Sequence, residues 1–233
     1  MARLRHRKGY KEERKKLRSH KSRKENIKNQ RQLIMLACEG EKTERFYFEA
    51  FFDRLKRSHT ISKLSCVIAP HKHTNPTGVL NDLLQCVTNT GYTYKDYEER
   101  WIVIDRDKER AGGGGPTLDD YMKAITRAKD IGVDVAWSNP SFELWYLLHF
   151  EYRNTGIDRY ELIARLSKCL GNKYQKNDTN LFAELESKVN NAIRNANRLL
   201  ENAVESDAPK MNPATNVVKL VEKLFSFEQE KEQ

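Results

Sequence analysis

Two stretches decide the fold of this protein: Leu33-Ile34-Met35-Leu36-Ala37-Cys38-Glu39 and Trp101-Ile102-Val103-Ile104-Asp105-Arg106-Asp107. Each is a short run of apolar residues that ends in an acidic residue. An uninterrupted apolar run of this length predicts a β-strand buried on both faces, as in a parallel sheet that is covered by helices. The two acidic endings mark the points at which these strands leave the core.

The chain between and after these stretches alternates in the same way. Further strands are predicted at 64–69 and 133–137, and helices at 46–55, 77–87 and 118–128. Strands that alternate with helices at this spacing indicate an α/β protein with a doubly wound, Rossmann-like sheet. We therefore expect a mainly parallel four-stranded sheet with flanking helices.

The last third of the sequence is helical in character. Helices are predicted over 160–170, where Gly171 ends the pattern, and over 181–204. Asn212-Pro213 combines a capping residue with a proline suited to a first helical position, and predicts that the last helix starts there. The expected organisation is a basic arm (1–31), an α/β core (32–155) and a C-terminal helical region packed on the core (156–233).

Positive charge is concentrated in the arm. The 233 residues carry a formal charge of +9; residues 1–31 hold seven Arg and seven Lys against three Glu, a charge of +11, so the rest of the chain carries −2. With only six apolar residues, the arm is expected to be disordered until a polyanion orders it. A solubilising tail is the alternative. The arm residues predicted to bind nucleic acid are Arg3, Arg5, Arg7, Lys8, Lys15, Lys16 and Arg18.

Composition excludes several classes of protein. The mean hydropathy is −0.81, and no apolar run approaches the roughly 18 residues of a transmembrane helix. The basic N-terminus lacks the apolar stretch of a signal peptide. The four cysteines form no C-x-x-C pair, which argues against a disulfide scaffold and a cysteine zinc site. We expect a cytoplasmic protein that does not act at a membrane.

Carboxylates follow three of the predicted strands. Glu39, with Glu41 and Glu44 close behind, follows the first strand; Asp105 and Asp107 follow the third; and Glu143 comes shortly after the fourth. Ligands of open α/β sheets bind beyond the carboxyl ends of the strands. Carboxylates two positions apart point the same way from an extended segment, so one cation suits both Asp105 and Asp107. Oxygen ligands of this kind favour Mg²⁺ or Mn²⁺.

Each of these residues has a simpler interpretation when taken alone. An isolated D-x-D is also an N-cap or a surface turn, and Glu39 also suits the amide groups at a helix N-terminus. Glu143 lies in an apolar segment, where a buried carboxylate needs a metal or a basic residue as its partner. Lys42 and Arg106 are candidates for phosphate contact, with solvated surface charge as the alternative.

Four motifs resemble those of the RloB-like family. They are Cys38-Glu39-Gly40-Glu41-Lys42-Thr43-Glu44, Ile104-Asp105-Arg106-Asp107, Ser138-Asn139-Pro140-Ser141-Phe142-Glu143-Leu144-Trp145 and Asn212-Pro213-Ala214-Thr215-Asn216-Val217. The resemblance implies a Toprim-like fold in which Glu39, Asp105 and Asp107 share a catalytic cation, with Glu41 and Glu143 as second candidates. It also implies a role in bacterial anti-phage defence (abortive infection) beside an AAA-type ATPase. The chain itself contains no G-x-x-x-x-G-K-[ST] motif.

The predicted function is metal-dependent hydrolysis of a phosphodiester bond in DNA or RNA, with tRNA among the candidates. In this hypothesis Glu143 holds a second ion or acts as general base. A nucleic-acid-binding or ATPase-regulating subunit with a structural acidic rim is the alternative. A third interpretation is a nuclease held inactive until a partner releases it. Primer synthesis is a further alternative for the activity, and a homodimer is an alternative for the oligomeric state.

Overall fold

The structure is a computed structural model, and it describes residues 31–58, 64–107, 115–201 and 207–229. The seven predicted nucleic-acid-binding residues of the basic arm lie outside these ranges. In chain order the elements are β1 (Arg31–Cys38), α2 (Thr43–Ser58), β2 (Leu64–Ile68), α3 (Pro76–Gln85), η1 (Tyr94–Asp96), β3 (Glu99–Asp105), α4 (Leu118–Asp130), β4 (Asp134–Asn139), α5 (Glu143–Leu148), α6 (Arg159–Leu170), α7 (Leu181–Glu186), α8 (Val189–Glu201), η2 (Ala208–Lys210), β5 (Ala214–Thr215) and α9 (Val217–Gln229).

The strands form one mixed sheet in the order β2-β1-β3-β4-β5. The first four of these are mutually parallel, and β5 pairs with β4 in the antiparallel direction. The predicted α/β class and the four parallel strands are confirmed. The expected strand count was wrong by one, because β5 is only two residues long and carries no periodic pattern of its own.

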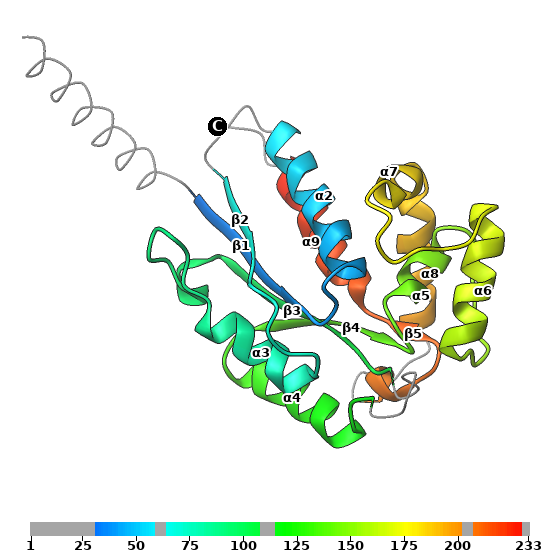
Figure 1. The fold of residues 1–233 in the computed structure, drawn as a ribbon, viewed down its shortest axis with the longest axis horizontal. Helices are drawn as coiled ribbons and strands as arrows, with labels where there is room; N and C mark the ends of the chain where they lie inside the picture. Colours follow the sequence, from blue (N-terminus) through cyan, green and yellow to red (C-terminus); the bar gives the residue numbers. More distant parts are fainter. Residues whose placement is uncertain (1–30, 59–63, 108–114, 202–206, 230–233) are drawn as a thin grey trace, which may run out of the picture.

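Helices cover both faces of the sheet (Figure 1). Successive side chains of a strand point to opposite faces, and β1 follows this rule from Ile34 to its end at Cys38. Met35 and Ala37 belong to the core shared with α3 and α4, whereas Ile34 and Leu36 belong to the core shared with α2 and α9. All four side chains are fully buried or nearly so. This explains why the β1 sequence is apolar throughout rather than alternating.

The C-terminal helices belong to the second of these cores. α5 contacts both α6 and α8, α8 contacts β5, and α9 lies beside α2 on the sheet. The predicted helix over 160–170 is confirmed as α6, and Gly171 ends it with a φ of +73°, a conformation that glycine adopts without strain. Because β5 and α9 return to the sheet, residues after 156 supply part of the central core.

Two predictions about the C-terminal region were wrong. The predicted helix over 181–204 is broken into α7 and α8, with Ser187 ending the first. No glycine or proline marks this break. Buried residues lie on both sides of the break, Leu185 in α7 and Val189 at the start of α8.

The segment at Asn212-Pro213 does not start a helix either. The Asn212 side chain accepts the N–H of Ile157 (3.2 Å) and donates to its C=O (2.9 Å). The next two residues form β5, and α9 starts at Val217. The asparagine therefore joins two distant loops instead of capping a helix.

No helix in the described part of the chain has the length and apolar character that crossing a bilayer requires.

Candidate active site

A cleft of about 520 Å³ opens at the carboxyl ends of β1 and β3, where open α/β sheets bind their ligands. It brings together the four predicted catalytic residues from three separate segments of the chain. Its lining residues are Glu39, Gly40, Glu41, Lys42, Thr43, Glu44, His71, Thr74, Asp105, Asp107, Glu143, Arg159 and Lys176.

The ends of β1 and β3 are linked by hydrogen bonds. The backbone N–H of Glu39 donates to the C=O of Val103 (3.0 Å), and Glu39 Oε2 accepts the backbone N–H of Asp105 (3.1 Å). Both carboxylate side chains are buried. Asp105 Oδ1 has no hydrogen-bond partner among the described residues. A buried anionic oxygen without a partner is costly, so this atom is a natural ligand for a cation.

Two cations of the C-terminal region also line the cleft. Arg159, the first residue of α6, forms an ion pair with Asp107, and its Nη2 lies 3.9 Å from Glu143 Oε1. Lys176 Nζ lies 3.7 Å from the same Glu143 oxygen. Two cations from the C-terminal region therefore face the acids delivered by the sheet. Sequence patterns did not single out either residue.

Glu143 is held by its surroundings. Its Oε2 accepts a hydrogen bond from Ser141 Oγ (2.6 Å), and its Oε1 accepts one from the Tyr174 hydroxyl (3.4 Å). Together with the two neighbouring cations, these contacts match the interpretation in which a basic residue is the partner of this buried carboxylate. Glu143 thus lies within ion-pair distance of two cations and accepts hydrogen bonds from two hydroxyl groups.

Glu44 is a further acid of the cleft that was not among the predicted site residues. It lies in the first turn of α2, and its carboxylate occupies the space that a Cβ at residue 40 would need, so glycine suits that position. Burial, reinforced by repulsion from Glu143, raises the pKa of Glu44 to about 7. The only feature of the sequence that pointed to Glu44 as a site residue was its position shortly after Glu39, in the run Glu41-Lys42-Thr43-Glu44.

The charge of the cleft is unbalanced toward the negative. Burial raises the pKa of Asp105 well above its ordinary value, and the nearby carboxylates of Glu44, Glu39 and Glu143 raise it further. Two of these acids thus hold their protons more tightly than a solvated carboxylate does. An added cation in the cleft would reverse this effect, because it favours the charged carboxylate.

The donor set fits a hard divalent cation. The Glu39 carboxylate accepts the backbone N–H of Asp105, and one Asp105 carboxylate oxygen is buried without a partner among the described residues. Across the described ranges, no three His, Cys, Asp or Glu side chains are already gathered into a group that could hold a metal ion. Asp107 is engaged by Arg159 instead. The three candidate metal ligands, Glu39, Asp105 and Asp107, therefore line one cleft, and the third of them is paired with a cation of the protein itself.

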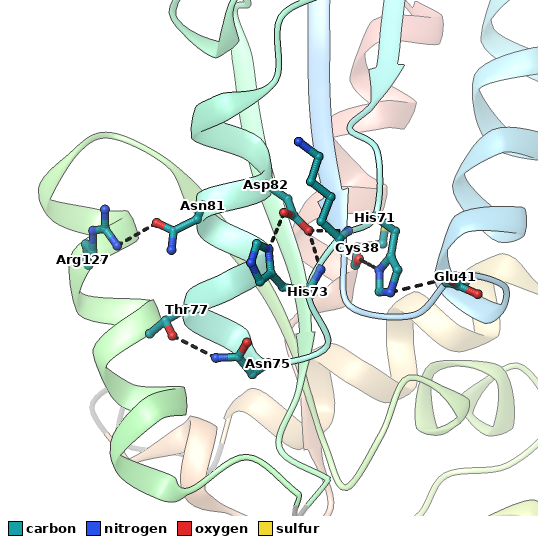
Figure 2. Close-up of polar contacts among 10 residues, drawn as sticks. Cys38, Glu41, His71, His73, Asn75, Thr77, Asn81, Asp82 and Arg127 are labelled. Atoms are coloured by element: carbon teal, nitrogen blue, oxygen red, sulfur yellow. Dashed lines mark hydrogen bonds and ion pairs between the residues drawn. The ribbon is translucent and has the colours of Figure 1, made fainter.

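The loop after β2 contributes His71 and Thr74 to the lining of the cleft, and Figure 2 shows the polar contacts around this loop. Buried Asp82 on α3 fixes this loop, because it accepts the backbone N–H (3.0 Å) and the ring Nδ1–H (2.6 Å) of His73. His71 lines the cleft, with Nδ1 3.4 Å from the carbonyl oxygen of Cys38 and Nε2 3.8 Å from Glu41 Oε1. His71 and Glu41 thus stand together at the mouth of the cleft.

The two predicted phosphate-contacting residues of the core have different positions. Lys42 is exposed and lines the cleft. Arg106 is not part of the described lining, and its Nη1 donates to the carbonyl oxygen of Pro116 (2.9 Å). Lys42 is therefore the better placed of the two for contact with a ligand in this cleft.

Fold and cleft together define an α/β protein with an acidic, ligand-sized site at the carboxyl ends of a parallel sheet. The chain belongs to the family described as RloB-like protein, whose family model matches residues 34–224. This confirms the resemblance seen in the motifs, and the matched range contains every residue named in the cleft. Comparison with curated proteins and with solved structures finds no match.

Proposed function

We propose that this RloB-like protein is a metal-dependent nuclease that hydrolyses phosphodiester bonds of DNA or RNA in bacterial anti-phage defence. One observation carries the proposal. Two neighbouring strand ends deliver Glu39, Asp105 and Asp107 to a single cleft, and the cations Arg159 and Lys176 line the same cleft. A phosphodiester bound beside a divalent cation needs both acidic and basic surroundings.

Glu39, Asp105 and Asp107 are the residues that would hold Mg²⁺ or Mn²⁺, with Glu41 and Glu143 as second choices. Bound there, the cation would polarise the phosphate, orient an attacking water and neutralise charge in the transition state. Four parallel strands, with a glutamate after β1 and a D-x-D after β3, also support a Toprim-like assignment.

The chain's own cations suit the phosphate. Arg159 presents a planar guanidinium, which matches phosphate oxygens with two parallel hydrogen bonds. Lys176 supplies a second positive charge in the cleft, and the exposed Lys42 supplies a third. These side chains would bind and orient the phosphate, whereas the acids alone would repel it.

The charge of residues 1–31 supports nucleic acid as the substrate class, because 14 basic residues against three acidic ones attract phosphates without reading sequence. By the family resemblance, an AAA-type ATPase is the proposed protein partner.

Cleavage of plasmid DNA, single-stranded DNA and bulk tRNA tests the proposal. Wild type, Asp105→Asn and the control Asp119→Asn would each be assayed with Mg²⁺, with Mn²⁺ and with EDTA. Asp119 is an exposed carboxylate on α4 outside the cleft, so its variant should cleave like wild type. We expect metal-dependent cleavage that Asp105→Asn lowers by roughly a hundredfold or more.

Cleavage that persists in EDTA or in Asp105→Asn would contradict the proposed site. Salt-sensitive binding without cleavage of any substrate would favour the alternative, a binding or ATPase-regulating subunit. Addition of the proposed AAA-type ATPase partner would then separate that alternative from a nuclease that its partner releases, since only the nuclease would gain cleavage.

A further inference from the structure

Arg159 stands where the proposed metal site and the proposed phosphate site meet. Its guanidinium pairs with Asp107, which is one of the three proposed metal ligands, and lies 3.9 Å from Glu143. The Arg159 side chain is 17% exposed and that of Asp107 is 4% exposed. An ion pair this well covered from water is a strong contact that must be exchanged for another, not merely broken.

The position of Arg159 on the chain makes such an exchange feasible. It is the first residue of α6, and the helix N-terminus is fixed by the side chain of Asp158, which accepts the backbone N–H of Glu161 (2.8 Å). The backbone under Arg159 is therefore anchored, while its long side chain extends into the cleft. A change of rotamer moves the guanidinium without unfolding the helix.

The acids of the cleft differ in how they are compensated. Asp107 has Arg159, and Glu143 has Arg159, Lys176 and two hydroxyl donors. Asp105 has a buried oxygen with no partner among the described residues. The site is thus partly neutralised by an internal cation at Asp107 and left open to an external one at Asp105.

We propose that Arg159 is an internal counter-ion that competes with the divalent cation for Asp107 and transfers to the substrate phosphate when one binds. This inference rests on the proposed function. Without phosphate, Arg159 holds Asp107 and weakens metal binding. With phosphate, the guanidinium bonds to phosphate oxygens, and Asp107 is released to the metal. Metal and phosphate therefore bind cooperatively, and the protein favours a metal only when the substrate is present.

Chemistry makes arginine suitable for this exchange. The guanidinium keeps its proton at any physiological pH, so its release from Asp107 depends on a competing anion and not on acidity. A carboxylate and a phosphate offer it the same paired geometry. Lysine carries the same charge but lacks this forked set of donors. A substitution of lysine for Arg159 therefore distinguishes the effect of charge from the effect of shape.

Mn²⁺ affinity is the measurement that tests the proposal, read from the electron paramagnetic resonance of free Mn²⁺. Each protein would be titrated alone and with thymidine 3′,5′-bisphosphate, which carries phosphate groups but no phosphodiester to cleave. Wild type should bind Mn²⁺ more tightly with the bisphosphate, by a factor between about 5 and 150. Arg159→Ala should bind Mn²⁺ more tightly than wild type in the absence of bisphosphate, and the bisphosphate should then add almost nothing.

Three further variants separate the exchange from simple changes in charge and from misfolding. Lys176→Ala removes the same charge from the cleft. Lys176 forms an ion pair with Glu143 and with no proposed metal ligand of first choice among the described residues, so this variant should keep most of the cooperativity. Arg159→Lys keeps the charge and should lose cooperativity while binding Mn²⁺ alone about as wild type does. Arg165→Ala changes an arginine of the same helix that pairs with Glu151, and should behave as wild type.

The outcomes are distinct. If wild type binds Mn²⁺ through Asp105 but Arg159→Ala leaves the affinity and the cooperativity unchanged, this inference is wrong and the proposed metal site stands. If Lys176→Ala matches Arg159→Ala, the effect is one of net charge and the exchange is also wrong. If neither wild type nor Arg159→Ala binds Mn²⁺, the proposed metal site fails, and this inference fails with it.

Discussion

Arg159 and Asp107 form an ion pair that joins the first residue of α6 to the segment just after β3. The two residues are 52 positions apart in the chain. The pair attaches the C-terminal helices to the sheet at the edge where ligands bind. It also gives one acid of the cleft a counter-ion that belongs to the protein itself.

Arg159→Ala should destabilise the protein by about 3 kcal/mol, because it removes the guanidinium that pairs with the buried carboxylate of Asp107 among other acids. Adding Asp107→Asn should recover part of this loss, since it removes the negative charge that the guanidinium neutralises. Urea unfolding followed by circular dichroism measures both. Lys123→Ala, which breaks an exposed pair with Asp119, should cost less than about 1 kcal/mol. Losses that simply add in the double variant would argue against direct pairing.

The buried acid Glu44 should make stability depend on pH. Folded Glu44 holds its proton up to a pH of about 7, whereas the ordinary pKa of 4.5 applies to the unfolded chain. Between these values folding requires proton uptake, so this group lowers stability as the pH rises. We expect the stability of Glu44→Gln, relative to wild type, to increase by about 3 kcal/mol from pH 4 to pH 8.

Urea unfolding at a series of pH values in EDTA checks this expectation. Glu184→Gln, which changes an exposed glutamate on α7, serves as the control and should run parallel to wild type. A Glu44→Gln curve that also runs parallel to wild type would show that Glu44 ionises normally in the folded protein.

Asn216 supports the β4 edge through its side chain. Its Oδ1 accepts the backbone N–H of Trp137 (2.6 Å), and its Nδ2 donates to the C=O of Val135 (2.8 Å). Asn216→Ala would leave buried backbone groups without these partners and should cost about 3 kcal/mol. Asn197→Ala, at a half-buried asparagine whose hydrogen bond to Glu222 is exposed, should cost under about 1 kcal/mol. Equal losses in thermal unfolding would contradict the role given to Asn216.

The basic arm should contribute affinity for nucleic acid without specificity. Substituting glutamine for all seven arm residues named above (Arg3, Arg5, Arg7, Lys8, Lys15, Lys16 and Arg18) should weaken binding of every sequence by a similar factor. The slope of log affinity against log salt should also become shallower, by about 0.9 for each phosphate of duplex DNA that the arm no longer neutralises. Fluorescence anisotropy at several salt concentrations measures both quantities. An unchanged slope would place the electrostatic interaction elsewhere.

Much of the fold was predictable because its signals are local. The apolar runs of β1 and β3 are continuous, so they could be recognised as buried strands without knowledge of their neighbours. Parallel pairing brings their carboxyl ends to one edge, and Glu39 and Asp105 could therefore be placed together in advance. Gly171 similarly ended α6 through its own conformational freedom.

Other features depend on partners that are distant in the chain. The two-residue strand β5 exists because Ser138 and Asn139 of β4 pair with it. Asn212 has the sequence pattern of a helix cap, yet its side chain is used by Ile157. In each case a tertiary interaction outweighs the local preference.

By itself, the sequence determined the α/β class, the family, the charged arm and the acids at the strand ends, because each is written in adjacent residues. Only the tertiary structure decided which cations face those acids. Arg159 and Lys176 lie in ordinary polar surroundings in the sequence and become part of the cleft through the packing of α6 and the segment after it. The electrostatic balance of a site is set by distance in space, and no local pattern in the chain encodes that distance.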